Sequence, residues 1–228
     1  MNNQMTPSFL RAFAVAVCLL IGVQAQAQNK IKVACVGNSI TAGTRLKQTY
    51  PMALQQLLGE SFEVRNYGVG SRTLLKKGDF PYWKEAQYQD ALGWQPDIVI
   101  IKLGTNDSKP QNWKFKDEFV PNYVELVNSF QNLPSKPKVY VCLPLPAFED
   151  KWGITGSIVK NEIIPAVQQV ARQTKAQTID LYTPFLGKAS LTYDAIHPNE
   201  EGAALLAAEV RKALPKKMKK KAKRSKAV

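Results

Sequence analysis

Five short apolar runs, separated by longer helix-like stretches, constrain the fold more than any other feature of this chain. The runs are rich in Val, Ile and aromatic residues, and several are continuously apolar, as expected of strands covered on both faces. They are Ile31–Val36, Phe62–Asn66, Asp97–Leu103, Lys138–Leu143 and Thr178–Leu181. The alternation predicts a parallel sheet with right-handed crossovers and helices on both faces. Ligand sites in such sheets lie at the carboxyl ends of the strands.

Four stretches outside these runs are predicted to be helical. They are a helix capped by Thr49 and running to Leu58, Lys116–Leu133, Ser157–Gln173 and Asn199–Leu214. Proline is tolerated in a first turn, which suits Pro51, but it breaks or kinks a helix interior. Pro121 therefore predicts a later start or a kink in the second helix, and Pro165 disturbs the third.

The N-terminal end has the pattern of a secretory signal peptide. Arg11 precedes an apolar run of eleven residues, Phe13–Val23, and Ala25-Gln26-Ala27 gives a cleavage pattern before Gln28. The alternative, an uncleaved anchor, needs about 20 apolar residues to cross a bilayer. We therefore expect an exported protein, periplasmic or secreted, with a signal peptide over residues 1–27, one domain over 28–214 and a tail over 215–228.

The formal net charge of +13 comes almost entirely from the C-terminal end. From Arg211 to Val228 there are ten Lys or Arg and no acidic residue. With this stretch and Arg11 set aside, 20 basic residues face 18 acidic ones, so the body of the protein is nearly neutral. The tail has no interleaved aromatic residues, so no specific nucleic-acid partner is predicted. A solvated tail and weak contact with anionic envelope polymers are the two interpretations.

Cysteine and histidine are too few for a metal cluster. Cys35 and Cys142 lie in apolar runs, which favours packed free thiols, although a disulfide stays possible in an exported chain. The single histidine and these two cysteines do not supply zinc ligands, and no calcium loop or phosphate loop is present. We therefore predict no cofactor and no metal.

Four polar blocks fall where the predicted sheet places its ligand site. Three follow the first three apolar runs, and the fourth precedes the last helix. They read Gly37-Asn38-Ser39-Ile40-Thr41, Asn66-Tyr67-Gly68-Val69-Gly70-Ser71, Gly104-Thr105-Asn106-Asp107 and Asp194-Ala195-Ile196-His197-Pro198. A serine such as Ser39 is a poor nucleophile until a base takes its proton, and His197 is the only histidine. Asp194 can fix the tautomer of that imidazole.

These blocks, in this order from about Lys32 to Leu206, resemble the SGNH or GDSL hydrolase superfamily. The resemblance implies a flavodoxin-like, three-layer α/β/α sandwich with a five-stranded parallel sheet. It also implies a serine esterase with a catalytic triad and an oxyanion hole. The residues that it assigns are Ser39, His197 and Asp194 for catalysis, and Asn106 with the backbone amides of Ser39 and of Gly70 or Ser71 for the oxyanion. Asp107 is expected to hold its loop through backbone amides.

The chain departs from the family pattern at two places. Family members usually read Ser-Gly where this chain reads Gly70-Ser71, so Ser71 takes the place of the usual glycine. Gly68 and Gly70 are interpreted as turn glycines. Asn38 stands where the family name has Asp, and we expect it to make similar turn bonds.

The expected substrate is an acetylated carbohydrate. Arg72–Gly78 and Leu143–Pro146 resemble bacterial carbohydrate deacetylases known as sialate O-acetylesterases, so sialic acid and plant polysaccharide are both candidates. Trp83, Trp113 and Trp152 lie in or near loops, where an indole either stacks on a sugar or packs internally. The alternatives are a broader acylhydrolase or lysophospholipase-like esterase, and a non-catalytic binder of carbohydrate or anionic surfaces.

Overall fold

Five parallel strands form one sheet in the computed structural model, which describes residues 30–215. The strands are β1 (Ile31–Gly37), β2 (Phe62–Gly68), β3 (Ile98–Lys102), β4 (Lys138–Leu143) and β5 (Gln177–Asp180). Their order, β2-β1-β3-β4-β5, is that of flavodoxin-like sheets. The predicted α/β fold is confirmed. The predicted signal peptide and the tail beyond Pro215 lie outside the described residues and stay predictions.

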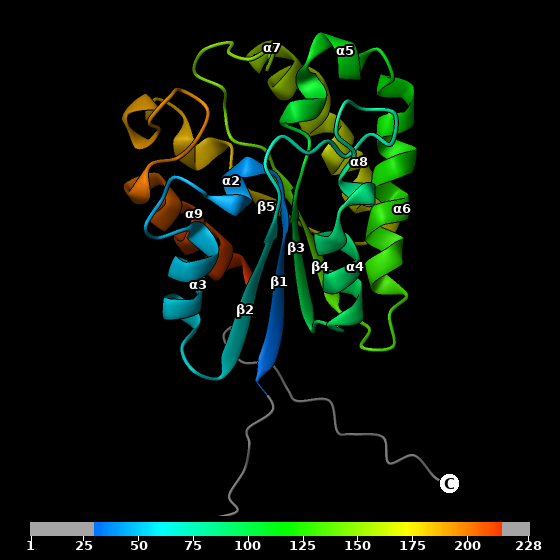
Figure 1. Cartoon of the computed structure of the whole chain (residues 1–228), viewed down its shortest axis with the longest axis vertical. Coiled ribbons are helices and arrows are strands. Elements are labelled where there is room, and N and C mark those ends of the chain that lie inside the picture. The colour runs from blue at the N-terminus through cyan, green and yellow to red at the C-terminus, as the bar shows by residue number, and fades with distance from the viewer. Residues whose placement is uncertain (1–29, 216–228) are drawn as a thin grey trace, which may run out of the picture.

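Helices cover both faces of the sheet (Figure 1). One face packs against α3 (Tyr50–Leu58) and α9 (Glu200–Ala213). The other packs against α4 (Ala86–Gly93), α6 (Phe119–Gln131) and α8 (Ile164–Thr174). Successive strand residues alternate between these two cores, which explains why the strands read as continuous apolar runs.

The predicted cap of α3 by Thr49 is in place, and α9 has a cap that was not predicted. The side chain of Thr49 accepts a hydrogen bond from the Met52 amide at the start of α3, and that of Asn199 accepts one from Gly202 at the start of α9. Each bond satisfies an amide that lacks a partner within its helix. These two helices pack side by side against the sheet (Figure 1).

Pro121 and Pro165, which were expected to disturb their helices, both lie where a missing backbone N–H is tolerated. Pro121 falls in the first turn of α6, because the chain before it forms a separate 3-10 turn over Lys116–Glu118. Before Pro165 the chain forms α7 (Gly156–Ile158) and then a π-helical turn over Val159–Ile163, which leads directly into α8. Pro165 has no backbone N–H and cannot donate the usual helical hydrogen bond. In the π-helical turn directly before it, the hydrogen bonds span five residues instead of the four of an α-helix.

Several short elements were not predicted from the sequence. They are α2 (Ser39–Ala42), α4, α5 (Pro110–Trp113) and brief 3-10 turns. α4 buries only Tyr88 and Ala91, so its apolar spacing is weak. The one-turn helices α2 and α5 are too short to have a periodic pattern.

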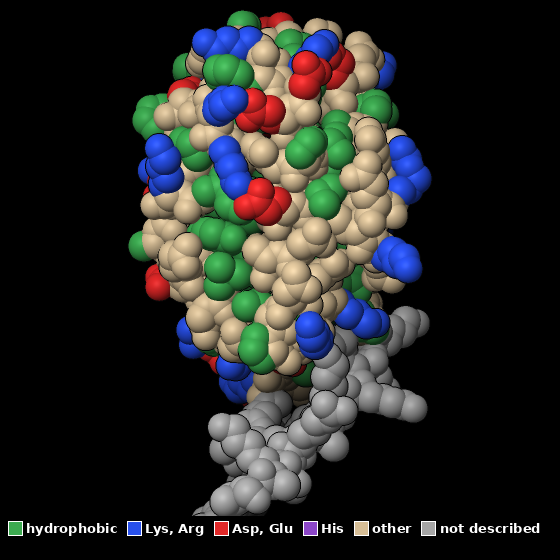
Figure 2. All heavy atoms as spheres, turned by 90° about the vertical axis from the view of Figure 1, so that its right-hand side faces the viewer, with side chains coloured by type: hydrophobic (Ala, Val, Ile, Leu, Met, Phe, Trp, Pro, Cys, Tyr) green, Lys and Arg blue, Asp and Glu red, His purple; other side chains and the backbone are tan. Residues whose placement is uncertain are grey.

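Both cysteines of the described chain are free and buried, as predicted. Burial raises the pKa of each thiol to about 12, with a smaller opposing effect from Tyr50 on Cys35 and from Lys102 on Cys142. On the surface, Lys, Arg, Asp and Glu are spread over the side of the molecule on which α6 lies, without a large patch of one sign (Figure 2). Within residues 30–215, no helix has the length and apolar character needed to cross a membrane.

Candidate active site

Ser39 is the first residue of α2, the single helical turn that follows β1. Asn38 caps this turn, and its Oδ1 accepts a hydrogen bond from the Ile40 amide at 3.1 Å. The expected turn bond of Asn38 is therefore present, although its Nδ2 is buried without a hydrogen-bond partner among the described residues. Because Ser39 lies in the first turn of α2, its backbone N–H has no carbonyl within the helix to receive it and is available to a ligand.

Two glycines allow α2 to lie directly on the ends of the strands. A Cβ atom on Gly37 would lie 2.1 Å from Oγ1 of Thr41, and one on Gly68 would lie 2.3 Å from the backbone nitrogen of Ala42. Neither distance is compatible with a side chain. Gly68 ends β2 and permits a close approach of backbones, whereas Gly70 lies in a turn as interpreted, and neither has a positive φ.

His197 reaches Ser39 from the opposite end of the chain. Its Nε2 lies 2.8 Å from Oγ of Ser39, and its Nδ1 lies 2.8 Å from Oδ2 of Asp194. Because an ionised carboxylate only accepts hydrogen bonds, Nδ1 is the protonated nitrogen and the Nε2 lone pair faces the serine hydroxyl. The three side chains therefore have the arrangement of an activated serine nucleophile.

Asp194 is fixed by its own loop as well as by the imidazole. Its Oδ1 accepts hydrogen bonds from the amides of Ile196, at 3.0 Å, and His197, at 2.6 Å. Burial raises the pKa of Asp194, but these amides and the His197 ring outweigh it and hold the pKa below its usual value. The carboxylate thus stays ionised beside the imidazole.

The candidate oxyanion donors surround the same cavity. Asn106 begins the 3-10 turn after β3, and one hydrogen of its Nδ2 is donated to the Arg72 carbonyl at 3.1 Å, which leaves the second for a ligand. Gly70 and Ser71 line the cavity with Ser39 and Asn106. Ser71 has a φ of +64°, the left-handed conformation that glycine favours, which explains how it takes the usual glycine's place.

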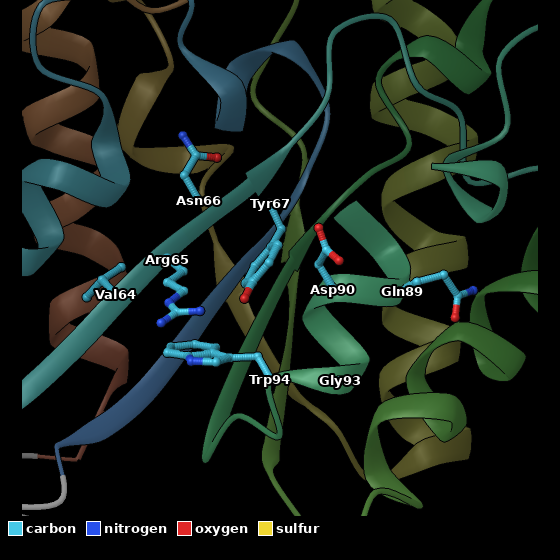
Figure 3. Close-up of a pocket in the computed structure, with 8 residues that line it drawn as sticks. All are labelled: Val64, Arg65, Asn66, Tyr67, Gln89, Asp90, Gly93 and Trp94. Atoms are coloured by element: carbon cyan, nitrogen blue, oxygen red, sulfur yellow. The ribbon is translucent and has the colours of Figure 1, made fainter. Parts of the chain in front are cut away.

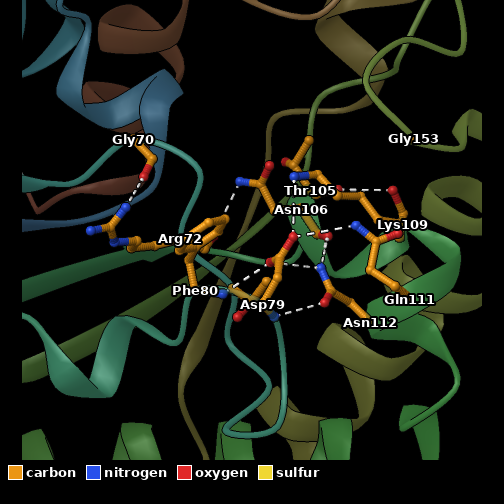
Figure 4. A network of polar contacts seen from close by, with 12 residues as sticks. Gly70, Arg72, Asp79, Phe80, Thr105, Asn106, Lys109, Gln111, Asn112 and Gly153 are labelled. Atoms are coloured by element: carbon orange, nitrogen blue, oxygen red, sulfur yellow. Dashed lines mark hydrogen bonds and ion pairs between the residues drawn. The ribbon is translucent and has the colours of Figure 1, made fainter.

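Polar contacts connect the loop after β2, which contains Gly70 and Ser71, to the loop after β3, which contains Asn106 (Figure 4). Arg72 donates to the Gly70 carbonyl at 2.8 Å and pairs with Glu85 at 2.7 Å. The buried carboxylate of Asp107 accepts the amides of Leu74 and Leu75, at 3.0 and 2.8 Å. Asp107 thus fastens the loop after β2 to the loop after β3, as predicted. Burial raises its pKa to about 6, although these amides act in the opposite direction.

The cavity has a volume of about 360 Å³ and two aromatic side chains at its edge. Trp152 and Tyr193 both line it, whereas the other two predicted candidates pack internally. The indole of Trp83 donates to the Leu74 carbonyl, and that of Trp113 donates to Glu162. Of the three tryptophans considered from the sequence, Trp152 is the one that lies at the cavity.

Sequence reasoning missed five residues that line the cavity, and they are Thr44, Arg45, Lys109, Ile154 and Tyr193. Tyr193 stacks on the His197 ring, with 5.6 Å between ring centroids and an angle of 9° between the planes. Its position directly before Asp194 was an available signal. Arg45 and Lys109 come from separate loops, so nothing in their local sequence identifies them.

A second hollow, of about 720 Å³, lies beside the edge strand β2 (Figure 3). Its lining combines polar side chains with Val64, Tyr67 and Trp94, and the guanidinium of Arg65 lies 4.4 Å from the centre of the Trp94 ring. It contains none of the predicted site residues and no pair that resembles a nucleophile and its base. Within residues 30–215, no group of three His, Cys, Asp or Glu side chains is placed to bind a metal ion.

Comparison with known proteins gives a consistent picture. Residues 35–205 match the model of the GDSL-like Lipase/Acylhydrolase family. An acetylxylan esterase of Xylanibacter ruminicola is 41% identical over 210 residues, which is 82% of this chain and 44% of that protein. The chain thus spans less than half the length of this relative.

Solved structures match at the level of the fold. An acetyl xylan esterase, AlAXEase, superposes with a TM-score of 0.66 at 24% identity, over 81% of this chain and 100% of that one. Est24, a carbohydrate acetylesterase from Sinorhizobium meliloti, gives 0.63 at 21% identity, over 81% and 98%.

Proposed function

Because this chain belongs to the GDSL-like lipase/acylhydrolase family, we propose that it is a serine esterase that removes acetyl groups from carbohydrates. The observation that carries the proposal is the continuous hydrogen-bonded series from Ser39 through His197 to Asp194. A non-catalytic binder has no need of a histidine base oriented on a serine hydroxyl.

The reaction follows from the positions of these groups. Oγ of Ser39 attacks the acetyl carbonyl carbon while Nε2 of His197 takes the hydroxyl proton. The oxyanion receives hydrogen bonds from Asn106, from the Ser39 amide and from the amide of Gly70 or Ser71, and each such donor contributes about 3 kcal/mol to stabilising the transition state. His197 then returns the proton to the leaving sugar oxygen. Water attacks the acetyl-serine with His197 again as base, which releases acetate.

The substrate that we propose is acetylated xylan rather than an acetylated sialic acid. The support is the name of the relative that is 41% identical, an acetylxylan esterase. The solved structure of AlAXEase is also that of an acetyl xylan esterase, and none of the three relatives described above is named as a sialate esterase. We also propose that the protein is exported, as its N-terminal sequence predicts, because a polysaccharide substrate is found outside the cell.

The test is acetate release from acetylated xylo-oligosaccharides by the wild type and by Ser39→Ala. We expect the substitution to lower kcat by at least about a thousandfold. Ser157→Ala, which changes an exposed serine of α7, is the matched control and should act like the wild type. An active Ser39→Ala enzyme would refute the serine mechanism. Faster release from acetylated sialic acid, or from decanoyl esters, would instead support one of the other substrate classes.

A further inference from the structure

Trp152 is held in a conformation that tryptophan rarely adopts. It lies at the tip of a tight turn in which Lys151 and Ile154 pair in antiparallel fashion, and the Ile154 amide donates to the Lys151 carbonyl at 2.8 Å. Trp152 has a φ of +51° and Gly153 has a φ of +79°. Left-handed residues at both central positions define a turn that favours Asn-Gly. A bulky side chain in this conformation is strained, and such strain is concentrated at functional sites.

The turn is fastened to the loop that contains Asn106. The Thr155 amide donates to Oγ of Ser108 at 3.0 Å. Gly153 packs on the stem of Lys109, because a Cβ atom at Gly153 would lie 3.6 Å from Cγ of that lysine. Lys109 is buried and its Nζ lies 3.6 Å from Asp79 (Figure 4). Trp152 is therefore fixed relative to the oxyanion hole.

Two exposed aromatic rings flank the catalytic histidine. The Trp152 side chain is at the cavity with 59% of the residue exposed, and Tyr193 is 42% exposed. Each ring centroid lies 5.6 Å from that of His197. Exposed aromatic surface of this size next to a catalytic base is unfavourable in water unless a ligand covers it. The carbon-bound hydrogens on one side of a pyranose ring pack well on such a surface.

Hydrogen-bond donors lie around these rings. The guanidinium of Arg45 is 5.5 Å from the centre of the Tyr193 ring, and Lys109 lines the same cavity. A sugar presents hydroxyl groups at its edge and apolar faces above and below. The two aromatic rings match the apolar faces of a sugar, and the side chains of Arg45 and Lys109 match its hydroxyl groups. A simple alkyl acetate would contact neither set of side chains.

We propose that Trp152 and Tyr193 form a sugar-binding subsite that holds the acetylated pyranose beside Ser39 and so makes the enzyme selective for acetylated sugars over simple acetates. This inference rests on the proposed function. Trp152 is a specificity-determining residue in this proposal, and Tyr193 serves both to bind the sugar and to orient His197.

The test compares kcat/KM for acetylated xylo-oligosaccharides with kcat/KM for ethyl acetate. Trp152→Asn removes the indole while it supplies a residue that the turn favours, so folding is preserved. We expect the ratio of the two constants to fall about tenfold, the effect of losing one aromatic contact, mainly through KM for the sugar. Trp152→Phe should keep most of the ratio. Met52→Ala, which removes an exposed apolar side chain on α3, should leave the ratio at the wild-type value.

A binding measurement separates this proposal from the proposed function. Deacetylated xylotriose should quench the tryptophan fluorescence of Ser39→Ala, and the quenching should be lost when Trp152→Asn is added. An unchanged ratio together with unchanged quenching would overturn the subsite. A wild-type enzyme that binds xylotriose but releases no acetate from any ester would refute the esterase function and leave the subsite supported.

Discussion

Ser71 shows how a single residue departs from the family pattern at a cost in stability. Its left-handed φ costs an L-residue about 1 kcal/mol, and glycine has no such penalty. We expect Ser71→Gly to raise the free energy of unfolding by up to about 1 kcal/mol, since the gain is partly offset by the flexibility of glycine in the unfolded chain. Esterase activity should be retained, because glycine keeps the backbone N–H. Urea unfolding and acetate release measure the two effects.

The control for Ser71 is a serine in ordinary helical conformation. Ser157→Gly, in α7, should lower stability by about 0.5–1 kcal/mol, because glycine is unfavourable there. A loss of activity in Ser71→Gly at unchanged stability would show that the hydroxyl contributes to the oxyanion hole, contrary to our interpretation.

Single residues were predictable where local sequence determines their position. The strand-to-turn block identified Ser39, and the short spacing between Asp194 and His197 places their side chains together. Trp152 and Tyr193 were different. Their importance depends on contacts with His197 made only in the folded chain, and an aromatic residue in a loop has the same local sequence whether it packs or binds.

At the scale of elements, the position of α2 depends on the end of β2. Gly68→Ala would place a Cβ atom 2.3 Å from the nitrogen of Ala42, a backbone atom that cannot rotate away. We expect α2 to shift, Ser39 to lose its 2.8 Å contact with His197, and kcat/KM to fall more than tenfold. The free energy of unfolding should fall by about 1–3 kcal/mol, the usual cost of overpacking. Kinetics and urea unfolding test both.

Gly93→Ala is the matched control for this substitution. Gly93 ends α4 and has open space where a Cβ atom would be placed, so stability and activity should stay near the wild-type values. Normal kinetics in Gly68→Ala would show that α2 adjusts without moving Ser39, and would contradict the requirement for close approach.

Continuous burial made some strands easy to predict, although β5, with one buried residue of four, was predicted as well. All five residues of β3 are buried, so its continuous apolar run was unambiguous. α4 buries only two of its eight residues and was missed. The π-helical turn before Pro165 depends on how the packed helix accommodates one absent amide, and the sequence shows only that proline is present.

At the scale of the whole molecule, the sheet brings distant parts of the chain to one edge. Ser39 and His197 are 158 positions apart, and they meet because β1 is an inner strand of the sheet while the loop before α9 returns to the same carboxyl edge.

The core beneath this edge contains a buried lysine. Lys102 ends β3 at 1% exposure, and its Nζ has no hydrogen-bond partner among the described residues. Burial lowers its pKa to about 7, while the charged form of the nearby Cys142 acts weakly in the opposite direction. In the unfolded chain lysine keeps a pKa of about 10.4. Protonated Lys102 is therefore a cost that the folded state bears at neutral pH.

Lys102→Met should stabilise the protein, because methionine fills a similar volume without a charge. At pH 7 we expect the free energy of unfolding to rise by on the order of 3 kcal/mol. Between about pH 7 and 10 the unfolded lysine binds more protons than the folded one, so wild-type stability rises with pH and the advantage of the variant shrinks to less than about 1 kcal/mol at pH 10. Lys138→Met, at an exposed position of β4, should show no such convergence with the wild type. If the free energies of unfolding of Lys102→Met and the wild type differed by the same amount throughout this pH range, Lys102 would have to stay charged in the folded core.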